Sequence, residues 1–149
     1  MASLFLRRSL TNSLMEKDAH IIDLPRFFDE RGNLSVLEEM NQVPFKIKRV
    51  FWIYDVPGGE ERGGHAYIKS KELIIALSGS FDVTVNDGNN TMKYSLNRSY
   101  YGLFVPEMTW RQMDNFSTNS IALVLSSTEY DANDYIRDFD EFLEKKGLL

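Results

Sequence analysis

Apolar and polar residues alternate along most of this chain in short runs, which are separated by turn-forming residues. A period of two places successive side chains on opposite faces of an extended strand. The run over residues 47–56 is the strongest, because β-branched and aromatic residues fill it. One of its faces would carry Arg49, Phe51, Ile53 and Asp55. Further strands are predicted over 34–38, 81–85, 91–96, 100–105, 109–113 and 120–126, with an extended segment over 19–28.

The period changes only in the tail. Over residues 134–146 the apolar positions fall at helical spacing, so the pattern predicts one helix there. Asp131 or Asn133 could cap its first turn, and Lys145 and Lys146 suit the negative end of the helix dipole. Many short strands followed by one terminal helix indicate an all-β barrel or jelly roll.

Composition excludes several classes of protein. The chain has 149 residues, which is the usual size of one domain, and a formal net charge of −5, which favours no nucleic-acid partner. It contains no cysteine, so disulfides and thiolate chemistry are excluded and the cytoplasm is the expected compartment. No apolar run approaches membrane-spanning length.

The first fourteen residues differ from the rest, with two arginines, no acidic residue and no strand pattern. We interpret residues 1–14 as an N-terminal extension, disordered or loosely docked. A single domain is then expected over 15–149.

One stretch concentrates the candidate chemistry. From Gly59 the chain places His65, Tyr67, Glu72 and Gly79 at intervals of six, two, five and seven residues. Residues two apart on a strand share a face, so His65 and Tyr67 point the same way. A turn at Ser78 and Gly79 would join two more strands. In a small barrel, His65, Tyr67 and Glu72 would then face the interior.

This spacing resembles the first motif of the cupin superfamily, G-x5-H-x-H-x3-4-E-x6-G, with Tyr67 in place of the second histidine. A metal-binding cupin adds a further histidine from a second motif, and that position matches Arg111. Only His65 and Glu72 remain of the four expected ligands. Arginine has no acceptor and tyrosine is a poor ligand for most divalent metals. We therefore predict no metal, and either organic acid–base chemistry or simple binding.

Four segments, over residues 29–39, 44–67, 79–88 and 127–142, are similar to the sugar-nucleotide 3,4-ketoisomerases, the WxcM-like C-terminal family. The resemblance covers about residues 20–145 and implies a cupin jelly-roll barrel. It also implies action on dTDP-4-dehydro-6-deoxyglucose, in the synthesis of amino sugars of surface polysaccharides. Members of the family are homodimers that exchange N-terminal strands and use no metal or other cofactor.

The resemblance also implies roles for single residues. The family usually has His-Ala-His where this chain has His65, Ala66 and Tyr67. A 3,4-ketoisomerisation needs a base near neutral pKa, which His65 can provide, and donors for the enediolate oxygens. Tyr67, Arg111 and Arg31 are the expected donors. Three cations are candidates for the pyrophosphate: Arg49, Arg62 and Lys69.

Two alternatives remain open at this point. The chain could be a sugar-nucleotide epimerase with the same barrel. It could also be a cupin that binds a sugar nucleotide without catalysis, since the second histidine is absent. Each candidate residue also has a structural interpretation. His65 could be a hydrogen-bonded interior residue, Tyr67 a core residue and Lys69 a solvated surface residue.

Overall fold

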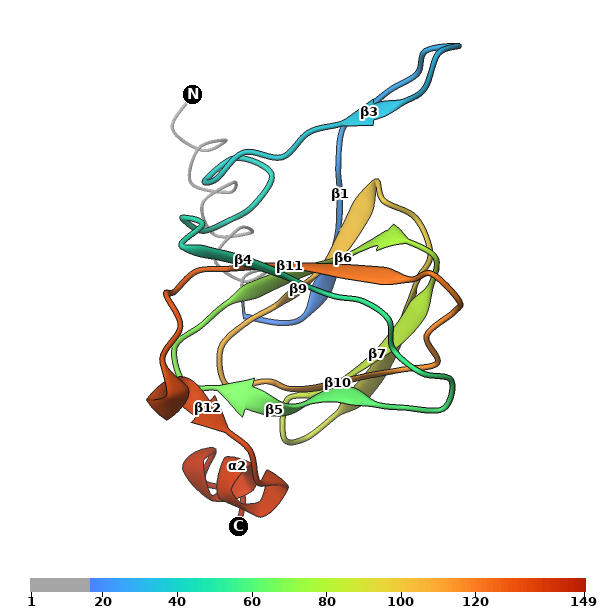
Figure 1. Ribbon diagram of the computed structural model, residues 1–149. Coiled ribbons are helices and arrows are strands. Elements are labelled where there is room, and N and C mark those ends of the chain that lie inside the picture. Colours follow the sequence, from blue (N-terminus) through green and yellow to red (C-terminus); the bar gives the residue numbers. More distant parts are fainter. Residues whose placement is uncertain (1–16) are drawn as a thin grey trace, which may run out of the picture.

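Two five-stranded antiparallel sheets face each other and enclose the core of the molecule (Figure 1). The structure, a computed structural model, describes residues 17–149, so the expected domain boundary at Met15 and the extension before it lie outside the described residues. The first sheet has the order β1-β9-β6-β11-β4 and the second has the order β12-β5-β10-β7-β8. The predicted all-β jelly-roll barrel with a C-terminal helix is confirmed.

The strands of the first sheet are β1 (His20–Asp23), β9 (Tyr101–Val105), β6 (Glu72–Ser78), β11 (Ile121–Ser126) and β4 (Arg49–Ile53). Those of the second sheet are β12 (Tyr135–Ile136), β5 (Arg62–Tyr67), β10 (Trp110–Asp114), β7 (Phe81–Asn86) and β8 (Thr91–Leu96). A separate hairpin pairs β2 (Arg26–Phe27) with β3 (Leu34–Ser35) and projects from the barrel (Figure 1).

The core lies between the two sheets. Alternate residues of each strand point inward, and those from β6, β7, β8, β9, β10 and β11 form one cluster of buried apolar side chains. Burying such side chains is the main favourable contribution to folding. The cluster contains Ile74, Ala76, Phe81, Val83, Val85, Leu96, Leu103, Val105, Met113, Ala122 and Val124.

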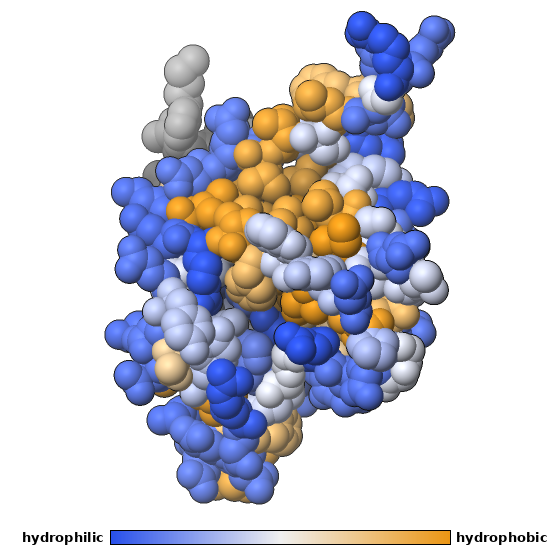
Figure 2. Space-filling model, viewed as in Figure 1, coloured by the Kyte–Doolittle hydropathy of each residue, from blue (hydrophilic) through white to orange (hydrophobic). Residues whose placement is uncertain are grey.

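A second apolar cluster covers the outer face of the first sheet. Leu73, Ile75 and Leu125 point outward from their strands and pack against Val43 and Phe45, which come from the connection between β3 and β4. This cover is incomplete, because Figure 2 shows apolar side chains still exposed between the hairpin and the barrel. The exposed apolar residues of the hairpin are Phe27, Phe28 and Leu34, and those of the first sheet include Val50, Trp52 and Leu77.

The tail corrects one prediction. A single helix was expected over 134–146, but the helix α2 spans only Phe139–Lys145 and its N-cap is Asp138. The preceding residues form the 3-10 turn η1 (Ala132–Asp134), which Asp131 caps, and the strand β12. Unpaired backbone groups at the edge of β5 recruit β12, and this pairing overrides the helical period. No helix of residues 17–149 could span a membrane.

Two strand boundaries also differ from the prediction. The strand expected over 34–38 is limited to Leu34–Ser35, and it pairs only within its own hairpin. The strand expected over 47–56 is β4, which begins at Arg49 and ends at Ile53. Asp55 follows with a φ of 55°, a left-handed conformation that a strand cannot continue through. The predicted alternation holds within β4, where Arg49, Phe51 and Ile53 are the more buried side chains.

Candidate active site

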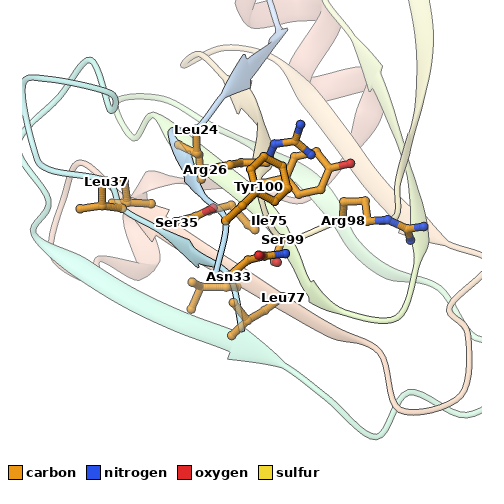
Figure 3. Close-up of a pocket in the computed structure, with 13 residues that line it drawn as sticks. Leu24, Arg26, Asn33, Ser35, Leu37, Ile75, Leu77, Arg98, Ser99 and Tyr100 are labelled. Atoms are coloured by element: carbon orange, nitrogen blue, oxygen red, sulfur yellow. The ribbon is translucent and has the colours of Figure 1, made fainter. Parts of the chain in front are cut away.

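Two surface pockets of similar size differ in the chemistry of their walls. One has a volume of about 540 Å³ and lies between the projecting hairpin and the first sheet (Figure 3). Its charged residues are only Arg26 and Arg98, and Arg26 stacks on Tyr100 at 4.1 Å. This pocket offers no acid–base pair.

The other pocket has a volume of about 500 Å³ and opens at one end of the barrel interior. Its lining joins a histidine, two tyrosines and three arginines, so it is the better candidate for an active site. The lining residues are Phe51, Trp52, Ile53, Glu61, Arg62, Gly63, Gly64, His65, Tyr67, Arg111, Tyr135 and Arg137.

Strand β5 positions His65 and Tyr67 in this pocket. Both side chains point inward and are 7% and 4% exposed, whereas Ala66 between them packs outward against Ile136 and Phe142. The rings of His65 and Tyr67 meet edge to face with centroids 4.8 Å apart. The prediction that His65 and Tyr67 share one face of the strand is therefore confirmed. Residues of the C-terminal tail cover the opposite face of β5.

Strand β10 places Arg111 directly beside this pair. Arg111 is the antiparallel partner of His65 in the register between β10 and β5. Its Nη1 donates to the carbonyl of Gly63 at 3.2 Å. Gly63 has a φ of +73°, and a Cβ there would lie 1.9 Å from Nη1 of Arg111. Only glycine suits this position, because it adopts positive φ readily and leaves room for the guanidinium.

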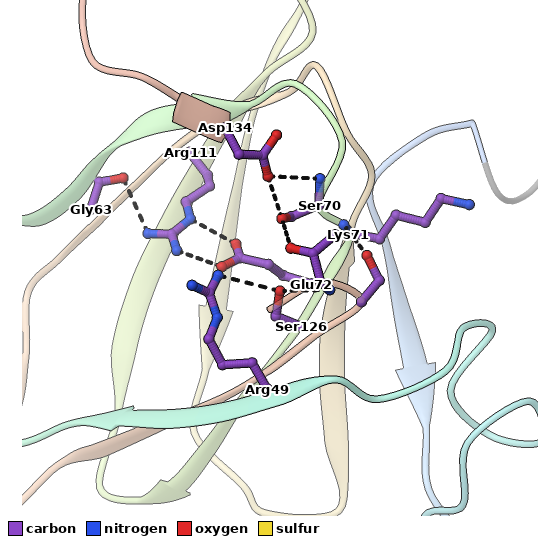
Figure 4. A network of polar contacts seen from close by, with 10 residues as sticks. Arg49, Gly63, Ser70, Lys71, Glu72, Arg111, Ser126 and Asp134 are labelled. Carbon is purple, nitrogen blue, oxygen red and sulfur yellow. Dashed lines mark hydrogen bonds and ion pairs between the residues drawn. The ribbon is translucent and has the colours of Figure 1, made fainter. Parts of the chain in front are cut away.

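Glu72 holds Arg111 from the opposite sheet (Figure 4). The Nε and Nη2 atoms of Arg111 donate to the two carboxylate oxygens of Glu72 at 2.9 and 2.8 Å. Both side chains are almost completely buried, at 2% and 1% exposure. A bidentate pair of this kind has defined geometry as well as charge. It crosses the barrel and fixes the guanidinium next to His65.

The electrostatics of the pocket keep His65 neutral. Burial lowers the pKa of His65 to about 3, and nearby arginines, Arg111 foremost, act in the same direction. Burial, and after it the charge of Glu72, raises the pKa of Tyr67 above its usual value, so the phenol stays protonated. Burial opposes the charge on Arg111, but Glu72 outweighs this and raises the pKa of Arg111. The site thus combines a neutral imidazole, a phenol and a cation.

Two buried atoms in this site lack hydrogen-bond partners within the described chain. They are Nε2 of His65 and the hydroxyl of Tyr67. Buried polar atoms are normally satisfied, so an unsatisfied pair beside a pocket indicates where a ligand bonds. An interior histidine with only a structural role would be hydrogen-bonded instead.

Comparison with known proteins agrees with this arrangement. Residues 17–147 match the FdtA family, described as WxcM-like, C-terminal. The chain belongs to this family. A curated relative, the TDP-4-oxo-6-deoxy-alpha-D-glucose-3,4-oxoisomerase of Aneurinibacillus thermoaerophilus, is 38% identical over 135 residues, which are 85% of this chain and 97% of the relative.

Several solved structures are also similar to this chain. A 3,4-ketoisomerase from Helicobacter canadensis has a TM-score of 0.85 and 41% identity, covering 87% of this chain and 98% of its own. QdtA, a sugar 3,4-ketoisomerase from Thermoanaerobacterium thermosaccharolyticum solved with TDP, has a TM-score of 0.84 and 32% identity, covering 88% and 97%. The dTDP-4-dehydrorhamnose 3,5-epimerase of Bacillus anthracis shares the fold, with a TM-score of 0.71 and 17% identity over 79% and 77%.

The other predicted site residues of this FdtA-family chain lie in different places. Arg62 lines the pocket at its exposed end. Arg49 lies deeper beside the ion pair, where its Nη2 donates to Ser126 at 3.4 Å. Lys69 is exposed on the turn after β5, outside the lining. Arg31 is on the projecting hairpin, paired with Asp29 at 2.8 Å, and its side chain is 90% exposed. Within one chain, Arg31 therefore does not join His65.

Two residues that line the pocket, Tyr135 and Arg137, were not among the predicted site residues. Strand β12 pairs Tyr135 with Tyr67, and the Tyr135 ring lies 4.7 Å from that of Tyr67 and 4.9 Å from that of His65. Arg137 stacks over Tyr135 at 4.3 Å. The expected helix would have directed these residues elsewhere. The polar run before Tyr135 is the one local signal that the helix begins later.

The donor set does not suit a divalent metal. Glu72 is the only carboxylate of the cupin motif, and both of its oxygens accept hydrogen bonds from Arg111. A permanently charged guanidinium thus stands where a metal-binding cupin has its fourth ligand. Within residues 17–149, no group of three metal-binding side chains occurs.

Proposed function

We propose that this chain is a TDP-sugar 3,4-ketoisomerase. It moves the keto group of a TDP-4-keto-6-deoxyhexose from C-4 to C-3 through an enediol, in the synthesis of deoxyamino sugars for surface polysaccharides. One observation carries the proposal: a buried imidazole with a free nitrogen stands beside a phenol and a fixed cation in one pocket. Two relatives with this activity, 38% and 41% identical, support it.

The reaction needs a base for one carbon-bound proton. In this proposal Nε2 of His65 takes the proton from C-3, and the electron pair forms the enediolate with its negative charge on the C-4 oxygen. The hydroxyl proton on O-3 then moves to O-4, and the imidazolium, after exchanging its proton with solvent, donates a proton to C-4. The lowered pKa of His65 departs from the near-neutral value expected of the base. It keeps the imidazole neutral and able to accept the first proton, and it makes the imidazolium a strong proton donor in the last step.

Arg111 and Tyr67 serve the oxygens. The fixed guanidinium of Arg111 stabilises the developing negative charge, which is the largest contribution in many enzymes of this kind. The phenol of Tyr67 stays protonated, so it donates a hydrogen bond or relays the proton between O-3 and O-4. Tyr67 thereby takes the place of the usual second histidine of the family. The reaction then needs no metal or other cofactor.

We also propose a homodimer with exchanged N-terminal strands, acting in the cytoplasm. Exposed apolar residues on the hairpin and on the neighbouring sheet, among them Phe28, Leu34 and Trp52, support an interface there (Figure 2). The hairpin carries Arg31, which lies outside the pocket of its own chain. In the dimer it would reach the other active site and add a second cation for the enediolate.

Co-expression of two inactive variants tests this exchange. His65→Asn retains Arg31, and Arg31→Gln retains His65, so an exchanged heterodimer has one complete site. We expect the mixed dimer to regain activity that both homodimers lack. If Arg31 served its own chain, the mixed dimer would have no complete site and would stay inactive.

Incubation with TDP-4-keto-6-deoxyglucose in deuterated water tests the reaction itself. We expect deuterium at C-4 and a 3-keto product, followed by NMR. Exchange with inversion of configuration but without a carbonyl shift would identify an epimerase. Binding without any exchange would identify a protein that only binds the sugar nucleotide.

A further inference from the structure

The base of the proposed reaction has little direct contact with solvent. His65 is buried, and both its Nε2 atom and the hydroxyl of Tyr67 beside it are shielded from water. The reaction places the C-3 proton on Nε2, where it exchanges with solvent before a proton reaches C-4. With a sugar in the pocket, this exchange needs a neighbouring group that accepts one proton and releases another.

Most polar groups of the pocket lining cannot carry a proton in this way. A guanidinium stays protonated and has no acceptor atom, which excludes the three arginines of the lining. Glu61 accepts a hydrogen bond from Gln112, whose side chain alternates with Arg111 and so points to the other face of β10. A phenol both donates and accepts, and the lining contains two phenols, Tyr67 and Tyr135.

Tyr135 contacts both buried groups and is itself partly exposed. Strand β12 pairs it with Tyr67, and its ring centroid lies 4.9 Å from that of His65 and 4.7 Å from that of Tyr67. Burial, and after it Glu72, raises the pKa of Tyr67, and the side chain of Tyr135 acts in the same direction. Of the two phenols, Tyr135 is therefore the one that lies against the imidazole and is also accessible from outside the pocket.

The position of Tyr135 is fixed from both sides. Strand β12 has only two residues, so its ladder with β5 is short. Asp134 secures it, because its carboxylate accepts from the backbone of Lys69 at 2.7 Å and from the hydroxyl of Ser70 at 2.5 Å (Figure 4). On the other side of the strand in sequence, Arg137 stacks over the Tyr135 ring at 4.3 Å. These contacts hold the phenol against the imidazole.

We infer that Tyr135 carries protons between His65 and solvent during the reaction. This inference rests on the proposed function and concerns its exchange step alone. The imidazolium passes its proton to the phenol oxygen while the hydroxyl proton leaves for a water molecule, so no charge remains on the tyrosine. After the hydroxyl has exchanged with water, the reverse passage returns a solvent proton to Nε2, which donates it to C-4. Tyr135 thus acts only through His65, as a positioning residue for the proton.

Retention of an isotope tests this role. TDP-4-keto-6-deoxyglucose with deuterium at C-3 is converted to a small extent in ordinary water, and deuterium at C-4 of the 3-keto product is measured by NMR. In the wild type, solvent exchange should remove most of the label. Tyr135→Phe keeps the ring and its packing but removes the hydroxyl, so the retained fraction should rise several-fold. A merely structural role would lower turnover without changing this fraction.

Tyr130→Phe is the matched control. Tyr130 is exposed, its ring lies 6.0 Å from that of Tyr135, and it is not part of the pocket lining. Loss of its hydroxyl should change neither turnover nor the retained fraction. If Tyr135→Phe does not fold, Asp134→Asn, which weakens the contacts that hold β12, should raise the retained fraction instead.

Two results would overturn the inference. One is equal retention in the wild type and in the folded test variant. The other is complete retention in the wild type, which would mean that the proton on His65 never exchanges. A wild-type protein that forms no 3-keto product would instead contradict the proposed function.

Discussion

The two ends of the barrel interior are built from the same strands but hold different side chains. Along β6, Glu72 and Ile74 both point inward, two residues apart, and along β10 the same holds for Arg111 and Met113. At one end the inward positions are polar and belong to the site. At the other end they are apolar and belong to the core. One alternating pattern therefore produces both regions, and only the residue type at each inward position separates them.

This difference separates catalysis from stability. Burial of apolar area stabilises the fold at one end, whereas a buried ion pair at the other end contributes little net stability. The side chains of the polar end can therefore be selected for the reaction rather than for stability. The apolar end stabilises the strands that position those side chains. Substitutions at the two ends should have different consequences.

The largest effect is expected for His65→Asn. The change keeps size and polarity but removes the titratable nitrogen, so turnover should fall about a hundredfold to ten-thousandfold. Steady-state kinetics with the TDP-4-keto sugar would measure this. TDP affinity and the melting temperature should change little. Near-wild-type deuterium exchange in this variant would reject His65 as the base.

Glu72→Leu should destabilise the polar end. It leaves Arg111 buried without its partner, and breaking a buried pair in this way costs about 3–5 kcal/mol of unfolding free energy. Denaturant unfolding would measure the loss. The double variant Glu72→Leu, Arg111→Met should recover most of the stability but not the activity. Recovery of activity would show that the pair has no catalytic role.

Leu103→Ala is the matched change at the apolar end. Leu103 is fully buried in the core, so its truncation should cost about 2–5 kcal/mol of unfolding free energy. Turnover per folded molecule should stay near the wild-type value, in contrast to the variants of the polar end. A loss of turnover in fully folded protein would mean that the two ends are coupled.

Stability should depend on pH through His65. Its pKa is about 3 in the folded protein and near 6.5 when unfolded, so the unfolded chain binds more protons between these values. Unfolding free energy should therefore fall as pH drops from about 6.5, by up to about 1.4 kcal/mol per pH unit. Between pH 7 and 5, the wild type should lose about 2 kcal/mol more than His65→Asn. Equal losses would show that His65 keeps an ordinary pKa.

The smallest effect is expected for Tyr67→Phe. It removes one hydrogen-bond donor and keeps the ring, so turnover should fall roughly tenfold, less than for His65→Asn, with TDP binding retained. Tyr67→His restores the common family pattern and should keep or raise the rate. If Tyr67→Phe is as fast as the wild type, Tyr67 only packs against His65.

Local pattern was sufficient for much of the fold. Strand positions follow from the period of two, and the common inward face of His65, Tyr67 and Glu72 follows from their spacing along two strands that are consecutive in the chain. These features are predictable because each depends on residues close together in the chain.

The remaining features depend on contacts between distant segments. Arg111 and Glu72 are 39 residues apart, and only the closure of the barrel brings their side chains together. The tail forms β12 because the edge of β5 offers it backbone partners, and this pairing places Tyr135 and Arg137 in the pocket. The spacing of apolar residues in the tail cannot show whether helix or strand forms there. The free energy that favours the strand comes from pairing with β5, which lies far away in the sequence. For the same reason, sequence alone could not show that Arg31 lies outside the pocket of its own chain.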